Sequence, residues 1–540
     1  MKNLIFVLIL GAVLGEIKVI PYPKHVETGS DILKFSRCEL NLESFIDQPF
    51  AEILDVHKEI IMGNQRPCQP DAPKPITVKV MQRQRLSGSD CASEEYELEI
   101  TKQGIFMTSQ CPVGLVRALS TLEQLIEKHK DSQHGEEVIV IKDIPIKISD
   151  EPRFSYRGIM IDSARHFLEI NVLQKIINGM MLAKLNVFHW HIADDDSFPM
   201  QSKHIPGLGE DGAFTRRELY TVQDIKNLIQ YAKARGVRII PEIDVPGHSR
   251  AIGKHQPLND IVTCYNSPAP HNLRNYYRIR GGPPGGALDP TMNKTYEFMD
   301  KILRDLKDYF EDDLIHLGGD EVPYRCWLDK QSIVDFMKEH GFKEAYELQI
   351  YFMQKARELL KNIDNKKRVI YWSDQATYKL KYSSDDILQF WGPSTEIPKL
   401  KDMYPNNSFI LSPSDYLYLD CGVGNKYGGR SWCDPYKTWL KIYQFEPTNY
   451  SLPESNILGA EAPAWAEQID DFNIELKLWP RVLSLAERLW MPKNNDPINL
   501  GSLIKRLNAF SAKLRERGIP SNPVTRQYCE IHMDECYGNI

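Results

Sequence analysis

Two adjacent carboxylates, Asp320 and Glu321, are the side chains in this sequence best suited to acid–base chemistry. They follow a short apolar run at residues 314–317 and a pair of glycines. An apolar run of this length predicts a buried strand, and the glycines allow the backbone to turn tightly beside a ligand. Two carboxyl groups at such a strand end would lie close together and partly out of water. Like charge and burial raise the pKa of one of them, which is the condition for a general acid near neutral pH.

Adjacent acids also occur on ordinary surfaces, where Asp320 and Glu321 would begin a loop and cap a helix near Pro323. The organisation of the rest of the chain favours the chemical interpretation. From Arg153 onward, apolar strand patterns alternate with helical patterns. The expected strands lie at residues 158–162, 186–192, 237–244, 314–317, 369–372, 387–391, 409–411 and 457–460. The expected helices lie at residues 173–185, 222–235, 296–309, 345–362, 483–489 and 500–517.

Eight buried strands with helical crossovers predict an α/β fold, a (β/α)8 TIM barrel. The catalytic groups of such barrels lie just past the C-terminal ends of the strands. Polar and aromatic side chains gather at all eight of these ends. Among them are Arg165, His191, Asp194, His248, Asp320, Glu321, Trp372, Trp391, Tyr418, Asp420, Trp465 and Glu467.

The aromatic residues of this cluster indicate a sugar as the ligand. Pyranose rings offer apolar C–H faces to aromatic rings, while carboxylates and arginine bind the hydroxyl groups. A single tryptophan is more often part of a core. Three tryptophans and a tyrosine beside carboxylates favour a carbohydrate pocket instead. Paired carboxylates at its centre then indicate glycoside hydrolysis, in which one acid protonates the leaving oxygen.

Seven stretches of the sequence carry a family resemblance. They are RGIMIDSARHFL (157–168), KLNVFHWHIADDDSFP (184–199), IPEIDVPGHS (240–249), HLGGDEV (316–322), YLDCG (418–422), GAEAPAWAE (459–467) and WPRVLSLAERLW (479–490). They closely resemble the β-N-acetylhexosaminidases of glycoside hydrolase family 20, over the whole mature chain. The resemblance implies a noncatalytic α+β domain before the barrel. It also implies a retaining exo-enzyme that removes terminal non-reducing GlcNAc or GalNAc from glycoconjugates or chitooligosaccharides.

The same resemblance implies a mechanism without an enzymic nucleophile, because family 20 uses the 2-acetamido group of the substrate. By family match, Glu321 is the general acid and later the base that activates water. Asp320 orients the acetamido group and holds positive charge on its nitrogen. Tyr418 donates a hydrogen bond to the acetamido oxygen. Two acids can be neighbours in sequence because neither has to attack the sugar from the opposite face.

The substrate-binding and supporting residues are likewise implied by the resemblance. Trp372, Trp391 and Trp465 would wall the pocket. Arg165 would bind the ring 3- and 4-hydroxyls, with Asp420 and Glu467 on the side of the 4- and 6-hydroxyls. The residues expected to orient Glu321 are Asp194, His191 and His248. A disulfide between Cys264 and Cys326 would tie the loop after strand three to the loop after Glu321.

Position 421 bears on specificity. Family members that accept a 6-sulfated sugar place a cation after the position of Asp420, whereas this sequence has Cys421. An acid without a neighbouring cation disfavours sulfate, so we expect a preference for neutral terminal sugars.

Length and composition indicate a folded protein of more than one domain. The chain has 540 residues, of which 42% are hydrophobic and 26% charged, with a net charge of −7. This balance gives no basic patch for nucleic acid. We expect domains at residues 16–152 and 153–540, the second with a C-terminal helical extension. The first mixes strands at 95–100, 105–109 and 137–141 with a helix at 113–127, and shows no chemistry.

The N-terminus predicts entry into the secretory pathway. Residues 1–15 combine a charged start with an apolar segment too short to span a bilayer, which is typical of a removable signal peptide. We therefore expect a lysosomal or secreted protein that is not held in a membrane. Sequons at Asn293, Asn406 and Asn449 are compatible with glycosylation. A homodimer is a further expectation, because dimers are common among similar enzymes.

Ten cysteines in a secreted chain indicate disulfides, although spacing does not fix their connectivity. Sequence neighbours suggest the pairs Cys38–Cys68, Cys91–Cys111, Cys421–Cys433 and Cys529–Cys536, which leaves Cys264 with Cys326. The sequence has no CxxC pair, which disfavours a zinc ribbon or a thioredoxin-type site.

Two other classes of function compete with a cofactor-free hydrolase. His189 and His191 form an HxH motif that, with Asp194 and His248, could bind a metal in an amidohydrolase-like barrel. Such sites usually need further histidines at later strand ends, which strands five to eight lack. The other class is a sugar-binding protein without turnover, which the joint presence of Asp320, Glu321 and Tyr418 disfavours. We expect neither a metal nor a cofactor.

Overall fold

A computed structural model describes residues 17–45, 56–57, 76–82, 92–130, 137–265, 285–373, 382–424, 430–493, 498–532 and 535–536. The chain divides into two compact units. The second comprises Arg153–Trp490 and Leu514–Val524, and the first comprises the described residues of the rest. Residues 491–513 and those from 525 onward therefore group with the first unit, although the sequence analysis places them in an extension of the barrel domain. The expected signal peptide lies outside the described residues.

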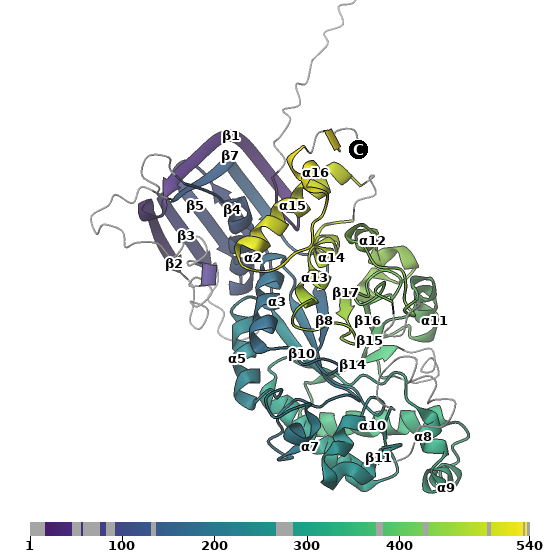
Figure 1. Cartoon of the computed structure of the whole chain (residues 1–540). Helices are drawn as coiled ribbons and strands as arrows, with labels where there is room; N and C mark the ends of the chain where they lie inside the picture. Colours follow the sequence, from purple (N-terminus) through teal and green to yellow (C-terminus); the bar gives the residue numbers. More distant parts are fainter. Residues whose placement is uncertain are drawn as a thin grey trace, which may run out of the picture. The chain divides into compact units, whose positions relative to one another are not determined.

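The first unit is built on a seven-stranded sheet in the order β1-β7-β4-β5-β3-β2, with β6 also pairing with β7 (Figure 1). Its strands are β1 (His25–Ser36), β2 (Leu40–Phe45), β3 (Ile76–Gln82), β4 (Tyr96–Ile100), β5 (Gly104–Ser109), β6 (Glu127–Lys130) and β7 (Glu137–Asp150). Helix α2 (Pro112–Leu125) is buried along almost its whole length. The sequence predicts α2, β4, β5 and the start of β7. It misses β1 because the first half of that strand is largely exposed and lacks an apolar alternation.

The second unit is a closed parallel barrel, which confirms the TIM-barrel prediction. Its strands are β8 (Tyr156–Asp162), β9 (Val187–Ala193), β10 (Arg238–Ile243), β13 (Leu314–His316), β14 (Arg368–Ser373), β15 (Ile387–Phe390), β16 (Ser408–Leu411) and β17 (Ile457–Ala464). The barrel closes where β17 pairs with β8. All eight are strands expected from the sequence, because strands covered on both faces read as continuous apolar runs.

The helices of this unit follow the expected pattern and lie between the strands in the chain. The longer ones are α3 (Ile170–Leu182), α5 (Val222–Lys233), α7 (Asn293–Tyr309), α10 (Ala345–Ile363) and α14 (Arg481–Trp490). Helix α5 begins with a capping box in which Thr221 and Asp224 satisfy each other's backbone N–H groups. Within the described parts of the chain, no helix combines the length and the apolar character that crossing a bilayer needs.

The inside of the barrel is layered. Each strand contributes one side chain to an apolar layer, which consists of Tyr156, Val187, Ile240, Leu314, Ile370, Ile387, Ile410 and the partly buried Leu458. Side chains alternate between the two faces of a strand, so the next inward residue lies two positions further on. That residue is polar or aromatic at six positions: His189, Glu242, His316, Trp372, Gln389 and Ser412, the last just beyond β16. On β17, where the register shifts, Glu461 lies three positions after Leu458 and bonds His189 in the same layer. A buried polar layer therefore lies between the apolar core and the C-terminal mouth of the barrel.

Three disulfides join described residues: Cys264–Cys326, Cys421–Cys433 and Cys529–Cys536. Each is a pair suggested from the sequence. Cys38 and Cys111 are also disulfide-bonded. Their suggested partners, Cys68 and Cys91, lie outside the described residues.

Candidate active site

The turn after β13 positions the two adjacent acids. Gly318 and Gly319 adopt φ values of +60° and +97°, in the left-handed region that glycine tolerates. The Gly319 N–H donates to Asp244 Oδ1 at 2.9 Å, and Gln349 Nε2 on α10 donates to the Gly319 carbonyl at 2.7 Å. A Cβ on Gly318 would lie 1.8 Å from Asp244 Oδ1. The turn is thus fixed from both sides, and only glycine fits at its first position.

Asp320 and Glu321 emerge from this turn into different surroundings. Asp320 is 9% exposed, and its Oδ1 is buried without a hydrogen-bond partner among the described residues. Burial, with repulsion from Asp244 next, raises the pKa of Asp320 well above its usual range. The Glu321 side chain is 34% exposed, and its backbone has a φ of +47°. One acid is therefore buried with its neutral form favoured, while its neighbour reaches solvent.

A chain of polar contacts connects Glu321 to Arg165. Glu321 Oε2 lies 4.0 Å from His248 Nε2, and His248 Nδ1 lies 3.3 Å from Asp194 Oδ1. The other oxygen of Asp194 contacts Arg165 Nη2 at 2.8 Å and His191 Nε2 at 2.9 Å. Although burial opposes protonation, Asp194 and Asp244 raise the pKa of His248 well above its usual range. Although burial opposes ionisation, Arg165 and His248 lower the pKa of Asp194. The chain is thus a set of mutually stabilised charges.

Aromatic rings form a second connected group. The Trp372 and Trp465 rings lie 5.7 Å apart, and the Arg165 guanidinium lies 5.1 Å from the Trp465 ring. Trp391 and Trp465 both pack against the cluster that contains Tyr418. Burial raises the pKa of Tyr418 well above its usual range, so its hydroxyl stays protonated and can donate. The Nε1 atom of Trp391 is buried, and no described residue accepts its hydrogen.

A fourth tryptophan belongs to this group, although the sequence reasoning missed it. The Trp432 ring lies 5.8 Å from Trp391 and 5.5 Å from Tyr418, in edge-on contact with both. It is 55% exposed. An aromatic ring beside the pocket but open to solvent is suited to stack on a sugar. The sequence offered one signal for Trp432, namely that it precedes Cys433. Because Cys433 pairs with Cys421, which follows Asp420, the disulfide brings Trp432 close to Asp420.

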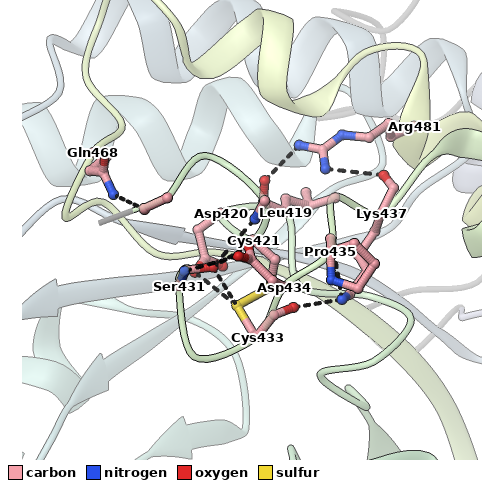
Figure 2. The surroundings of a disulfide bond; sticks show 12 residues. Leu419, Asp420, Cys421, Ser431, Cys433, Asp434, Pro435, Lys437, Gln468 and Arg481 are labelled. Carbon is pink, nitrogen blue, oxygen red and sulfur yellow. Dashed lines mark hydrogen bonds between the residues drawn. A yellow bond between two sulfur atoms is a disulfide. The ribbon is translucent and has the colours of Figure 1, made fainter. Parts of the chain in front are cut away.

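Asp420 lies at the start of the loop that the Cys421–Cys433 bond closes (Figure 2). Arg481 Nη2 donates to the Leu419 carbonyl at 2.7 Å, and Asp420 Oδ2 lies 3.8 Å from Cys433 Sγ. Asp420 Oδ1 is buried and has no hydrogen-bond partner among the described residues. Burial, with repulsion from Glu467 next, raises the pKa of Asp420 to about 8. Asp420 is therefore a neutral acid below that pH, beside a second carboxylate that is exposed.

Carboxylates contact both histidines of the HxH pair, and His189 also forms, with Glu242 and His316, a buried group whose ligand atoms lie within 4.8 Å of one another. His189 Nδ1 lies 2.9 Å from Glu461 Oε1, and its Nε2 lies 2.9 Å from Glu242 Oε2. His191 Nδ1 lies 2.7 Å from the same Glu242 oxygen, and its Nε2 contacts Asp194. Both histidines thus pair with carboxylates on each side, inside the packed barrel. This geometry favours buried ion pairs over the metal-binding alternative.

All twelve residues named from the sequence lie among the described residues, at the C-terminal end of the barrel strands or in the loops that follow. Polar contacts join five of them, and aromatic contacts or packing join Arg165 to the three tryptophans and Tyr418. Asp420 and Glu467 are linked by their electrostatic interaction. The arrangement offers a protonatable group, a buried acceptor of positive charge and an aromatic wall. These are the parts that acid-assisted cleavage of a glycosidic bond requires.

Comparisons with known proteins agree with this chemistry. The family described as glycosyl hydrolase family 20, catalytic domain, matches residues 154–493, and domain 2 of the same family matches residues 16–144. Beta-hexosaminidase 1 of Coccidioides posadasii is 35% identical over 82% of this chain and 78% of its own length. Beta-hexosaminidase subunit beta of Felis catus is 30% identical over 94% of this chain and 93% of its own.

Solved structures show the same fold. An exo beta-N-acetylglucosaminidase of Vibrio harveyi, in complex with N-acetylglucosamine, gives a TM-score of 0.76 at 24% identity, covering 94% of this chain and 79% of its own. The beta-N-acetylhexosaminidase of Streptomyces coelicolor gives a TM-score of 0.74 at 23% identity, covering 94% and 98% of the two chains.

The Gly318→Ala substitution tests the turn. A side chain there meets both the left-handed backbone and Asp244, so we expect loss of stability beyond the roughly 1–2 kcal/mol of the backbone strain alone, together with loss of activity. Gly341→Ala is the matched control, because Gly341 has a φ of +72° with nothing within 4 Å of a Cβ. Thermal unfolding and turnover of both variants measure this. Equal behaviour of the two variants would contradict the assigned role of Asp244 in fixing the turn.

The pH dependence of stability tests the neutral state of Asp420. Its folded pKa of about 8 lies above the ordinary pKa of an unfolded carboxyl, so its contribution is complete below about pH 4 and is lost as pH rises to about 8. Asp420→Asn cannot ionise. We expect the melting temperature of this variant, relative to wild type, to rise from pH 4 to 8 and then level off. Asp335→Asn, at a 62% exposed side chain, is the control. A constant difference across this range would refute the assignment.

Proposed function

The chain belongs to glycoside hydrolase family 20 and is a β-N-acetylhexosaminidase, and from this premise we propose which of its residues perform each step. Enzymes of this family are retaining and use the 2-acetamido group of the substrate as the nucleophile. The substrate is a glycan with a terminal N-acetylhexosamine. The assignment of roles below rests on the geometry of the barrel mouth.

One observation carries the proposal. Three buried polar atoms at the mouth have no hydrogen-bond partner among the described residues: Asp320 Oδ1, Asp420 Oδ1 and Trp391 Nε1. A buried polar group without a partner costs about 1–3 kcal/mol, so such groups point to a ligand that satisfies them. Two acids and one aromatic donor match the amide and hydroxyl groups of an N-acetylated sugar.

Asp320 is suited to stabilise positive charge on the acetamido nitrogen. When the acetamide oxygen attacks the anomeric carbon, the amide nitrogen becomes positively charged. The raised pKa of Asp320 shows that burial and Asp244 disfavour its ionised form in the free protein, where nothing nearby fully compensates that charge. The developing cation supplies the missing compensation, so the interaction is stronger in the transition state than with the neutral substrate. Tyr418, which stays protonated, donates to the acetamide oxygen and holds it towards the anomeric carbon.

Glu321 is suited to exchange protons with the leaving group and with water. Its side chain is the more exposed of the two acids, and His248 lies 4.0 Å away. We assign it as the acid that protonates the glycosidic oxygen and as the base that activates water afterwards. His248 and Asp194 orient it, and His191 supports Asp194. Arg165, held by Asp162 and Asp194, binds the 3- and 4-hydroxyls of the ring.

Trp372, Trp391 and Trp465 wall the pocket, while Asp420 and Glu467 contact the 4- and 6-hydroxyls. The exposed ring of Trp432 extends this wall outward and is suited to the group attached to the terminal sugar. We propose delivery through the secretory pathway to the lysosome or the cell exterior. The three sequons support this route, since Asn293, Asn406 and Asn449 are all exposed. Homodimer formation remains an expectation.

Glu321→Gln tests the acid assignment. The amide keeps the shape of the side chain but cannot supply a proton, so we expect turnover to fall by about 10³-fold. The loss should be larger on N,N′-diacetylchitobiose, whose leaving alcohol needs protonation, than on a fluorogenic aryl N-acetyl-β-glucosaminide. Purified wild type and variant are compared at about pH 5, with a chelator added to a parallel wild-type sample. A loss below tenfold on the disaccharide, or sensitivity of wild type to the chelator, would refute the proposed mechanism.

Sulfate at the 6-position tests specificity. Arg481 and Lys437, near Asp420, are bonded to backbone carbonyls, and Cys421 is held in a disulfide. Because Asp420 is neutral at acidic pH, exclusion there comes from the missing cation rather than from a carboxylate charge. We expect kcat/KM for a 6-sulfated aryl glucosaminide to be at least about 30-fold below that of the neutral one, from roughly 2 kcal/mol of uncompensated charge. Comparable values for the two substrates would overturn this expectation.

A further inference from the structure

Glu242 lies at the centre of the buried polar layer of the barrel. It is fully buried, and four side-chain nitrogens surround its carboxylate. Oε1 accepts from Trp372 Nε1 at 2.7 Å and lies 3.1 Å from His316 Nδ1. Oε2 lies 2.7 Å from His191 Nδ1 and 2.9 Å from His189 Nε2. Trp372 Nε1 and His191 Nδ1 donate hydrogen bonds to this carboxylate, whereas His316 Nδ1 accepts the Gly318 N–H and lies beside it without donating.

Three of these contacts lead to separate parts of the site. Trp372 is one wall of the acetamido pocket. His191 pairs with Asp194, which in turn holds Arg165 and His248. The Gly318 N–H, in the turn that carries the two acids, donates to His316 Nδ1 at 2.9 Å. The wall, the hydroxyl-binding arm and the acid-bearing turn therefore share one buried anchor, which touches neither the substrate pocket nor solvent.

We propose that Glu242 is a positioning residue, which sets the relative placement of the acetamido pocket and the proton-transfer groups through hydrogen bonds to Trp372 and His191 and through its contact with His316. This inference rests on the proposed function, because it concerns the step in which the acetamide attacks while Glu321 protonates the leaving oxygen. That step needs both groups in place at once, and a displacement of about 1 Å can cost about 10²-fold in rate.

The electrostatics of the layer support a charged anchor. Although burial opposes ionisation, His316, His191 and His189 lower the pKa of Glu242 well below its usual range. Although burial opposes protonation, Glu461 and Glu242 raise the pKa of His189 to about 9. Bonds to a buried charge are stronger than bonds between neutral groups. Trp372 is accordingly held by a stronger bond than a neutral acceptor would provide.

Glu461 offers a matched control in the same layer. It is equally buried and shares His189 with Glu242. Its remaining hydrogen bonds come from Tyr156 and Gln389, and among the described residues it makes none to Trp372, His191 or His316. Gln389 pairs with Trp372 in the backbone register of β14 and β15. Replacing either glutamate by glutamine therefore disturbs the packing and charge of one layer, but only the Glu242 substitution releases groups of the active site.

The experiment compares Glu242→Gln with Glu461→Gln in the full chain. The measurements are melting temperature, kcat and KM on a neutral aryl glucosaminide, and affinity for two ligands. One ligand is the product GlcNAc. The other is a bicyclic thiazoline, in which sulfur replaces the acetamide oxygen of the cyclised intermediate. Turnover by wild type tests the proposed function separately, so its failure is distinguishable from failure of this inference.

We expect Glu242→Gln to lower kcat about 10²-fold with KM changed less than about threefold, because the lost interaction is one that acts in the transition state. Affinity for the thiazoline should fall in parallel, while affinity for GlcNAc changes little. Glu461→Gln should lower the melting temperature to a similar extent but keep kcat within about threefold of wild type. A purely structural role for Glu242 would instead make the two variants behave alike.

Glu242→Asp keeps the negative charge but moves it away from the four neighbouring nitrogens. This variant tests the positioning role if the glutamine variant does not fold. We expect kcat and thiazoline affinity to fall together, about tenfold, with GlcNAc affinity retained. The proposal is overturned if a folded Glu242 variant keeps kcat within threefold of wild type. It is equally overturned if Glu461→Gln loses as much kcat as the Glu242 variants do.

Discussion

Repulsion among carboxylates is the constraint on which the catalytic unit depends. Asp194, Asp244, Asp320 and Asp420 converge at the barrel mouth, where burial weakens their hydration, and the exposed Glu467 lies beside them. The protein resolves this crowding unevenly. Asp194 is compensated by Arg165 and His248 and keeps its charge, whereas Asp320 and Asp420 are left with raised pKa values. At Asp320 and Asp420, a ligand with positive character or hydroxyl groups therefore lowers the energy of the site. Crowded acids can form a binding and catalytic surface in this way.

The alternation of side chains along each strand explains how the barrel contains buried polar groups without disrupting its apolar core. An apolar residue from each strand fills the lower layer, and the side chain two positions on belongs to the layer above it. Space in that upper layer is made by a small residue, since a Cβ on Gly158 would lie 2.8 Å from Glu461 Oε2. Pairs of glutamate and histidine hold this polar layer together, although His316 Nε2 and Gln389 Oε1 have no hydrogen-bond partner among the described residues. The layer therefore serves as a rigid, charged floor for the site instead of a void beneath it.

The fold could be predicted because its strands are covered on both faces and appear in the sequence as apolar runs. The strands of the first unit were only partly found, since β1 is half exposed. The gathering of the named side chains at one end of the barrel was predictable from strand ends and motifs, whereas the roles of Asp320 and Glu321 stay predictions. Two features were not predictable. Trp432 joins the aromatic wall only through the Cys421–Cys433 closure, and the contacts of Glu242, which lies on β10, come from three other strands, β9, β13 and β14. Such convergence depends on three-dimensional pairing, which no local pattern encodes.

Backbone strain is also found at the candidate active site. Glu321 and His248 both adopt a φ of +47°, which costs non-glycine residues of order 1–3 kcal/mol each. They lie on neighbouring loops that pack closely, since a Cβ on Gly247 would lie 3.0 Å from the Asp320 carbonyl. The Cys264–Cys326 disulfide ties the chain beyond His248 to the chain beyond Glu321. Covalent and packing constraints thus offset a conformation that neither residue favours alone. Glu321 lies at the end of a strained turn. That turn separates the exposed carboxyl of Glu321 from the buried carboxyl of Asp320.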